Sequence, residues 1–380
     1  MAMIALKDIA FIFGVSICAF VLAETVLRVL YRMNLSSPLP YGLRKNMLGR
    51  LGYIKLAPNF KGKSRFGISY RTNSLGYRDD EIDPGKKHVL FLGDSTTFGM
   101  NIDHEETYPE VFEKLLNRID GDLQSVNTAT PGQGTLDQLD ILKPLLGNGD
   151  LNIKAVVLGF FDNDFSDNYS HSISRSKERK GGILFEAKRY ITESIGVPRA
   201  YIYLTLWYGR ILKDLKKNMN LVSGKRDRAR SVSGVSGIYN MKEEGDIRRN
   251  VAWKLTIEAL DDIMELCDRH DIPFIFTYLP PRAEEALTGI GPKYESLLRE
   301  YLKGKRNVYY INAAVVYRNY LEKNGASGHL PEGFYSHKSD FRHPGPLACE
   351  LIAQELSAVY QDIARLRGRL PVSCSRRGAS

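Results

Sequence analysis

The sequence predicts an α/β protein in three layers, α/β/α, built on a doubly wound parallel sheet of five strands. Short apolar runs alternate with longer amphipathic stretches of helical period, which is typical of βα units around a parallel sheet. The 380 residues are 43% hydrophobic and 26% charged, as expected of a folded protein with a sizeable core. The five apolar runs are residues 88–93, 125–129, 155–161, 273–279 and 308–314.

Helices are expected between these runs. Thr107 and Thr135 each stand three residues before Glu110 or Gln138, in the pattern of a capping box. Apolar residues then recur at helical spacing behind each start, which predicts two helices packed on the sheet. Two further helices are expected at residues 251–269 and 345–366.

Composition divides the rest of the chain. Residues 1–33 are predicted to be a transmembrane anchor, or else a signal peptide, and residues 34–86 a linker and irregular N-terminal extension. The globular domain covers residues 87–367 and carries a basic insertion at 165–250. Residues 368–380 are expected to be a loose tail.

The N-terminal segment contains 15 uncharged residues, Ile9 to Ala23. A bilayer span needs about 20 residues, and Glu24 and Arg28 can extend the run by pairing four residues apart on one helical face. A cleaved signal peptide is the alternative, because Lys7 precedes the run and a small residue ends it. We predict an uncleaved single-pass anchor, since the apolar helical pattern continues past Ala23.

The basic insertion accounts for the net charge of +9, because residues 171–250 hold 18 Lys and Arg against 8 Asp and Glu. Such a patch suits an anionic membrane surface or an acidic polymer, and it equally suits a solvated insertion. Its centre, residues 201–215, has the composition of an apolar helix.

Polar residues follow three of the predicted strands. Ser95 ends the run in "HVLFLGDSTTFG", Gly132 and Gly134 follow the second strand, and Asn163 and Asp164 follow the third. In a doubly wound sheet, ligands bind at the carboxyl ends of the strands. The sequence therefore predicts a functional site at this edge.

His343 is the histidine best placed to act as a base. Asp340 lies three residues before it in "SDFRHPG". Three residues are about one turn, so the carboxylate can reach Nδ1 of the imidazole and leave Nε2 free to take a proton from Ser95. The alternative is that this pair caps the last helix.

Four blocks, in order, resemble those of the SGNH (GDSL) hydrolase family. They are Gly93-Asp94-Ser95, "NTATPGQG" with Gly132, "FFDNDF" with Asn163, and "SDFRH" with Asp340 and His343. The resemblance covers residues 88–366, with the insertion inside it, and implies a flavodoxin-like sheet.

The resemblance also implies a role for each site residue. Ser95 is the expected nucleophile, His343 the general base and then acid, and Asp340 the carboxylate that orients the imidazole. The expected oxyanion hole consists of the backbone N–H groups of Ser95 and Gly132 and the side-chain amide of Asn163. A serine hydroxyl needs such a base, and a tetrahedral intermediate needs such donors.

Two points in this set stay open. Gly134 is an alternative to Gly132 as the backbone donor. The third block also departs from the family's usual Gly-x-Asn-Asp, because Asp162 precedes Asn163 and the glycine, Gly159, is displaced. Asp94 is expected to bind neighbouring N–H groups rather than to catalyse.

The predicted function is that of a membrane-anchored serine esterase that cleaves an O-acyl ester, on a lipid or a cell-envelope glycan, through an acyl-enzyme. An O-acyltransferase acting on a polysaccharide and a non-catalytic glycan-binding or assembly module are the alternatives. No cofactor, metal or nucleic-acid partner is expected, because the sequence has no phosphate-binding glycine motif and no metal-type spacing of Cys and His. The oligomeric state is left open.

Two arguments place the catalytic domain on opposite sides of the membrane. Arg28, Arg32, Arg44 and Lys45 follow the apolar run and outnumber Lys7, so the positive-inside rule alone places the domain in the cytoplasm. An ester of the cell envelope requires the other side. We predict a membrane localisation with the catalytic domain outside the cytoplasm.

Overall fold

The computed structural model describes residues 2–32, 39, 43–45, 55–64, 66–119, 121–180, 238, 241–281, 283–288, 290–325, 330–337 and 340–368. The helix expected at 201–215, most of the basic insertion and nearly all of the predicted tail lie outside these residues.

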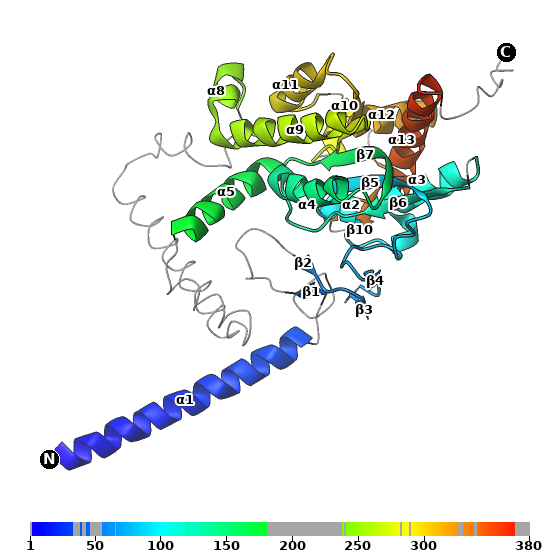
Figure 1. The fold of residues 1–380 in the computed structure, drawn as a ribbon. Helices are drawn as coiled ribbons and strands as arrows, with labels where there is room; N and C mark the ends of the chain where they lie inside the picture. The colour runs from blue at the N-terminus through cyan, green and yellow to red at the C-terminus, as the bar shows by residue number, and fades with distance from the viewer. Residues whose placement is uncertain are drawn as a thin grey trace.

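A five-stranded parallel sheet forms the centre of the molecule (Figure 1), as the sequence predicted. The strand order is β6-β5-β7-β8-β9, so the first strand along the chain lies between the second and the third. The chain therefore adds β6 on one side of β5 and the later strands on the other side. Doubly wound sheets bind ligands at the carboxyl ends of the strands beside such a switch point. The strands are β5 (Lys87–Gly93), β6 (Leu123–Asn127), β7 (Asn152–Phe160), β8 (Phe274–Tyr278) and β9 (Val308–Asn312).

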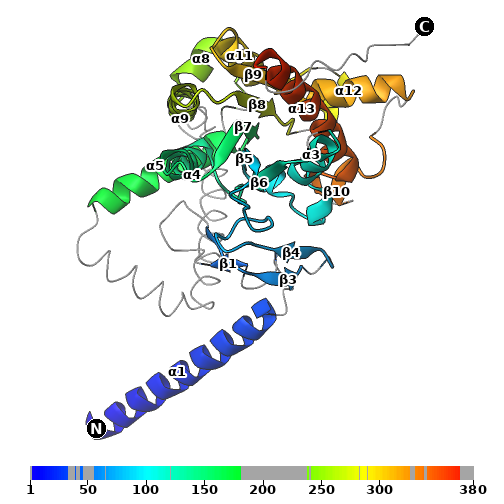
Figure 2. The ribbon, with the colours of Figure 1, turned by 45° about the vertical axis from the view of Figure 1, so that its right-hand side comes forward.

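Helices cover both faces of the sheet, because successive strand residues point to opposite sides. Leu90 and Leu92 pack into one core and Val89 and Phe91 into the other. Figure 2 shows α4, α5 and α9 on one side of the sheet and α3, α12 and α13 on the other. The first layer holds α4 (Thr135–Gly147), α5 (Asp164–Lys180), α8 (Glu244–Arg249), α9 (Val251–Arg269) and α11 (Lys293–Leu302), and the second holds α3 (Tyr108–Asn117), α12 (Ala313–Lys323) and α13 (Pro346–Leu366).

Short elements complete the fold. Two antiparallel pairs precede the sheet, β1 (Arg44–Lys45) with β2 (Lys55–Leu56) and β3 (Lys61–Lys63) with β4 (Ser69–Arg71). A third pair, β10 (Tyr335–His337) with β11 (Asp340–Pro344), precedes the last helix. The remaining elements are α2 (Ser95–Phe98), η1 (His104–Glu106) and α10 (Ala283–Thr288).

Two glycines make room for a buried hydrogen bond beside α2. Gly93 and Gly159 are register partners in β5 and β7. A Cβ at either position would lie within 2.3 Å of the Thr97 hydroxyl oxygen, which accepts a hydrogen bond from Tyr108 at 2.7 Å. The glycine that is displaced in the third sequence block therefore sits where α2 packs on the sheet.

The N-terminal extension packs on the segment that follows Ser95. Tyr70 of the extension stacks on Phe98 of α2, with ring centroids 5.8 Å apart. Arg78 is fully buried beside both rings. Its guanidinium donates to the carbonyl oxygens of Phe98 at 2.9 Å and Ile102 at 2.7 Å, and also to that of Gly99. Burial lowers the pKa of Arg78 to about 10, so it stays charged at neutral pH.

The predicted membrane anchor is contradicted. The N-terminal segment forms one long helix, α1 (Ala2–Arg32). In the described part of the chain, however, no helix combines the length and the apolarity that a bilayer span requires. The uncharged run of 15 residues, Ile9 to Ala23, is shorter than the roughly 20 residues that a bilayer span needs. The single-pass anchor and the membrane localisation derived from it were therefore wrong.

Replacing Arg78 should destabilise the protein strongly. Arg78→Leu keeps much of the buried volume but leaves several buried carbonyl groups without a donor, and each such loss costs about 1–3 kcal/mol. The free energy of unfolding in urea should fall by at least about 3 kcal/mol. Arg71→Leu is the matched control, because Arg71 is partly exposed and pairs with the exposed Asp80. A loss for Arg78→Leu no greater than for Arg71→Leu would contradict this account.

Candidate active site

Three of the predicted site residues lie at one edge of the sheet. Ser95 is the first residue of α2, directly after β5. Gly132 follows β6 in a turn where its φ is +83°, a conformation that favours glycine. Asn163 follows β7 in the turn before α5. Since β5 lies between β6 and β7, the carboxyl ends of these strands are neighbours.

Ser95, His343 and Asp340 are joined by short contacts. Nε2 of His343 lies 2.9 Å from Oγ of Ser95, and Nδ1 lies 2.7 Å from Oδ2 of Asp340. The imidazole is thus between a hydroxyl and a carboxylate, the order in which it can accept the serine proton. Ser95 is partly exposed, unlike the residues on either side of it.

The Asp340 carboxylate accepts several hydrogen bonds at once. Oδ2 accepts from Ser336 Oγ at 3.0 Å as well as facing His343, and Oδ1 accepts from the backbone N–H of Arg342 at 3.2 Å. Burial raises the pKa of Asp340, but the hydrogen bond to His343 and the charge of its imidazole outweigh this and leave the pKa well below its usual value. Asp340 is therefore ionised throughout the neutral range.

The alternative role for this pair, a cap for the last helix, is wrong. The N-cap residue of α13 is Gly345, and no side chain caps it. Asp340 and His343 lie instead on β11, which pairs with β10.

Asn101 also binds Asp340, and the sequence analysis missed it. Its side-chain amide donates to Oδ2 of Asp340 at 3.0 Å. The residue has a φ of +63°, and its backbone N–H donates to Tyr70 Oη at 2.9 Å. The contact joins residues 239 positions apart, so the only local sequence signal was an asparagine in the tight bend after α2, a type that tolerates this φ.

Asp94 has the structural role that was expected. It is the N-cap residue of α2, and its Oδ1 accepts from the backbone N–H of Thr96 at 2.8 Å and from the Thr96 hydroxyl at 2.7 Å. Asp94 thereby fixes the start of the helix that carries Ser95.

The backbone N–H groups of Gly134 and Gly132 differ in whether they already donate a hydrogen bond. Gly134 is buried, and its N–H donates to Oδ2 of Asp137 at 3.1 Å. Gly134, rather than the predicted Thr135, is also the N-cap residue of α4. Within the described residues, the N–H of Gly132 donates no hydrogen bond, and Gly132 is exposed. Gly132 is therefore the glycine with a free donor.

Asn163 is held by a neighbouring carboxyl group. Its amide nitrogen Nδ2 donates to Oδ2 of Asp167 at 2.9 Å, which leaves the second amide hydrogen for another acceptor. Burial, together with the charges of Asp94 and Asp137, raises the pKa of Asp167 to about 7. Asp167 is thus a positioning residue for Asn163.

The described contacts bring Ser95, His343 and Asp340 together directly, whereas none of them joins Gly132 or Asn163 to Ser95. An indirect link exists for Asn163, because Arg342 pairs with Asp162 at 3.1 Å. The segment that carries His343 is therefore tied to the turn that carries Asn163.

A second polar cluster lies apart from the contacts of Ser95. Asp79, His104 and Glu110 form a group whose ligand atoms all lie within 4.8 Å of one another. The sequence predicted no metal site, because a metal-type spacing of Cys and His would indicate one, and these three residues have none.

Comparison with known proteins found similar chains among solved structures. No family model and no curated protein matches the chain. Solved structures that resemble it include a member of the lipolytic protein G-D-S-L family from Veillonella parvula (11% identity, 72% of this chain and 98% of that one, TM-score 0.37). A psychrotrophic esterase, EstA, from Pseudoalteromonas sp. is similar (13%, 74% and 98%, 0.35), as is a catalytic mutant of Axe2, an acetylxylan esterase from Geobacillus stearothermophilus (11%, 73% and 95%, 0.38).

Asn101→Gly should slow the labelling of Ser95 by a serine-directed reagent. Glycine accepts the positive φ but removes the amide that binds the Asp340 carboxylate. A hydrogen bond to a charged group is worth about 1.5–3 kcal/mol, so the rate of labelling by a serine-directed phosphonate should fall about 10- to 100-fold. Asn59→Gly is the matched control, because exposed Asn59 has a φ of +53°. Equal rates for the two variants would contradict the role of Asn101.

Asp167 should make stability depend on pH near neutrality. Its folded-state pKa of about 7 lies above the ordinary 3.8, so its stabilising effect is fully present at acid pH and is lost as pH rises through 7. Asparagine cannot ionise, so Asp167→Asn should flatten the fall in Tm between pH 5 and pH 7, where the unfolded chain has already lost this proton and the folded protein still holds it. The exposed Asp150→Asn is the control and should keep the wild-type slope. An unchanged slope in Asp167→Asn would exclude this ionisation.

Proposed function

We propose that this protein is a serine esterase that transfers the acyl group of an O-acyl ester to Ser95 and then to water. The observation that carries the proposal is the pair of contacts made by His343, 2.9 Å to the Ser95 hydroxyl and 2.7 Å to the Asp340 carboxylate. Nothing in the packing of the fold requires a partly exposed serine, an imidazole and an ionised carboxylate in this order.

Acylation begins with the proton of Ser95. Nε2 of His343 accepts it as Oγ attacks the ester carbonyl carbon, and the positive imidazolium is stabilised by the Asp340 carboxylate. The carbon–oxygen bond to the leaving group then breaks, and the departing alkoxide takes the proton from Nε2. The products of this half are an alcohol and an ester on Ser95.

The negative oxygen of the tetrahedral intermediate needs fixed donors. We assign this role to the backbone N–H groups of Ser95 and Gly132 and to the free amide hydrogen of Asn163. The assignment is supported by the position of the three residues after adjacent strands and by the free N–H of Gly132. Removing one such donor typically costs about 2.7–4 kcal/mol of barrier stabilisation.

Deacylation repeats these steps with water. His343 takes a proton from the water molecule, whose oxygen attacks the acyl carbon, and returns the proton to Oγ of Ser95 as the acid leaves. The enzyme is restored without any change in oxidation state, so no cofactor is required.

A small pocket beside the proposed site suits the acyl group. It measures about 380 Å³, counting the space open to solvent, and Thr96 and Pro344, the chain neighbours of Ser95 and His343, line it. Apolar side chains make up most of the remaining lining: Phe161, Leu279, Tyr317, Leu330 and Phe334. A pocket of this size and polarity favours a short acyl chain.

Ester hydrolysis by the full chain should depend on Ser95 and Asp340. With p-nitrophenyl acetate as substrate, Ser95→Ala should lose turnover, and Asp340→Asn should lose up to about 10⁴-fold because the imidazole loses its orienting charge. Ser95→Ala should keep the wild-type Tm, and Asp340→Asn should lose far less stability than turnover.

Matched controls are Ser296→Ala and Asp362→Asn, which change a partly exposed serine on α11 and an exposed aspartate on α13. Turnover that survives in Ser95→Ala, or that is absent from folded wild-type protein, would refute the proposed function.

A further inference from the structure

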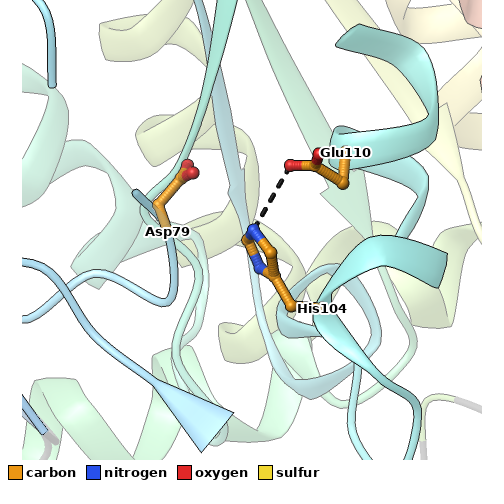
Figure 3. A group of neighbouring side chains, drawn as sticks. All are labelled: Asp79, His104 and Glu110. Atoms are coloured by element: carbon orange, nitrogen blue, oxygen red, sulfur yellow. Dashed lines mark ion pairs between the residues drawn. The ribbon is translucent and has the colours of Figure 1, made fainter. Parts of the chain in front are cut away.

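A buried polar cluster joins the N-terminal extension to the sheet domain (Figure 3). Asp79 comes from the extension, His104 from η1 and Glu110 from the first turn of α3. Asp79 and His104 are each 5% exposed, and the side chain of Glu110 is 17% exposed. Their ligand atoms lie within 4.8 Å of one another.

His104 points between the two carboxylates without a hydrogen-bond partner (Figure 3). Its Nε2 lies 3.3 Å from Oε2 of Glu110, but neither ring nitrogen makes a hydrogen bond within the described residues. A buried imidazole left in this state is costly. The observed separation also matches the distance of about 3.4 Å between two ligand atoms on a tetrahedral zinc ion with bonds of about 2.0–2.1 Å.

The charges around the cluster favour a cation at its centre. Oδ2 of Asp79 accepts from the backbone N–H of Asn127 at 2.6 Å and Oδ1 from that of Asp80 at 2.8 Å, so each oxygen keeps a lone pair. Glu110 pairs with Lys114, whose Nζ lies 3.6 Å from Oε1 and whose side chain is half exposed.

We propose that Asp79, His104 and Glu110 bind a zinc ion. One imidazole nitrogen and two carboxylate oxygens form a donor set that zinc accepts, whereas magnesium and calcium prefer oxygen ligands alone. Three protein ligands leave a fourth position for water.

The ion would act on stability rather than on the acyl transfer. Asp79 binds the backbone of Asn127, the last residue of β6, and the amide of Asn127 donates to the carbonyl oxygen of Thr97 in α2 at 3.1 Å. A cation held by Asp79 and by the η1–α3 segment therefore clamps the extension onto the strand that leads to Gly132.

The test uses the full chain, stripped of metal with a chelator and titrated with zinc chloride alone. Calorimetry should show one zinc ion bound per chain, and zinc should raise the Tm while magnesium does not. His104→Gln and Glu110→Gln should each lose the binding and the Tm increase. The control Glu105→Gln, which changes the exposed residue next to His104, should retain both.

Two outcomes would overturn the proposal. Wild-type protein that binds no zinc, and whose Tm zinc leaves unchanged, would show that the cluster is held by its own ion pair and binds no metal. Zinc bound equally well by Glu110→Gln would place the ion elsewhere. If His104→Gln fails to fold, the wild-type stoichiometry and the Glu110→Gln titration still decide between these results.

Discussion

The hydrogen bonds that converge on the Asp340 carboxylate are the constraint on which the candidate site depends. Serine, amide and backbone donors hold its two oxygens, and the imidazole of His343 completes the set. A carboxylate bound by so many donors has one orientation and remains ionised, so it fixes the position of the imidazole. The other ring nitrogen of His343 then faces the hydroxyl of Ser95.

The N-terminal extension contributes contacts that help to hold Asp340 in place. The buried guanidinium of Arg78 binds the carbonyl groups of the bend after α2, and Tyr70 binds the backbone of Asn101 in the same bend. Asn101 in turn binds Asp340. The N-terminal extension, whose composition resembled a linker, therefore helps to position the Asp340 carboxylate through Asn101. The carbonyl groups that it covers are the hydrogen-bond acceptors that allow the charged Arg78 to be buried.

The apolar runs predicted all five strands, because a strand buried on both faces is apolar along its whole length. Asp340 and His343 were predictable as a pair because they lie three residues apart. The role of Asn101 was not predictable, since it depends on a contact with a residue 239 positions away. The contact of His104 with Glu110 was not predictable either, since it depends on how the chain bends between η1 and α3. The predicted anchor was wrong for a different reason, because it extended an uncharged run of only 15 residues to the length of a bilayer span.

Trapping the acyl-enzyme tests the central claim most directly. Wild-type protein is mixed with p-nitrophenyl acetate, quenched in acid within the first turnovers, digested and analysed by mass spectrometry, beside His343→Gln. The account predicts an acetyl group on Ser95 in the wild type and none in the variant. Turnover without any acetylated Ser95, or an acetyl group on another residue that forms at the same rate in both proteins, would contradict it.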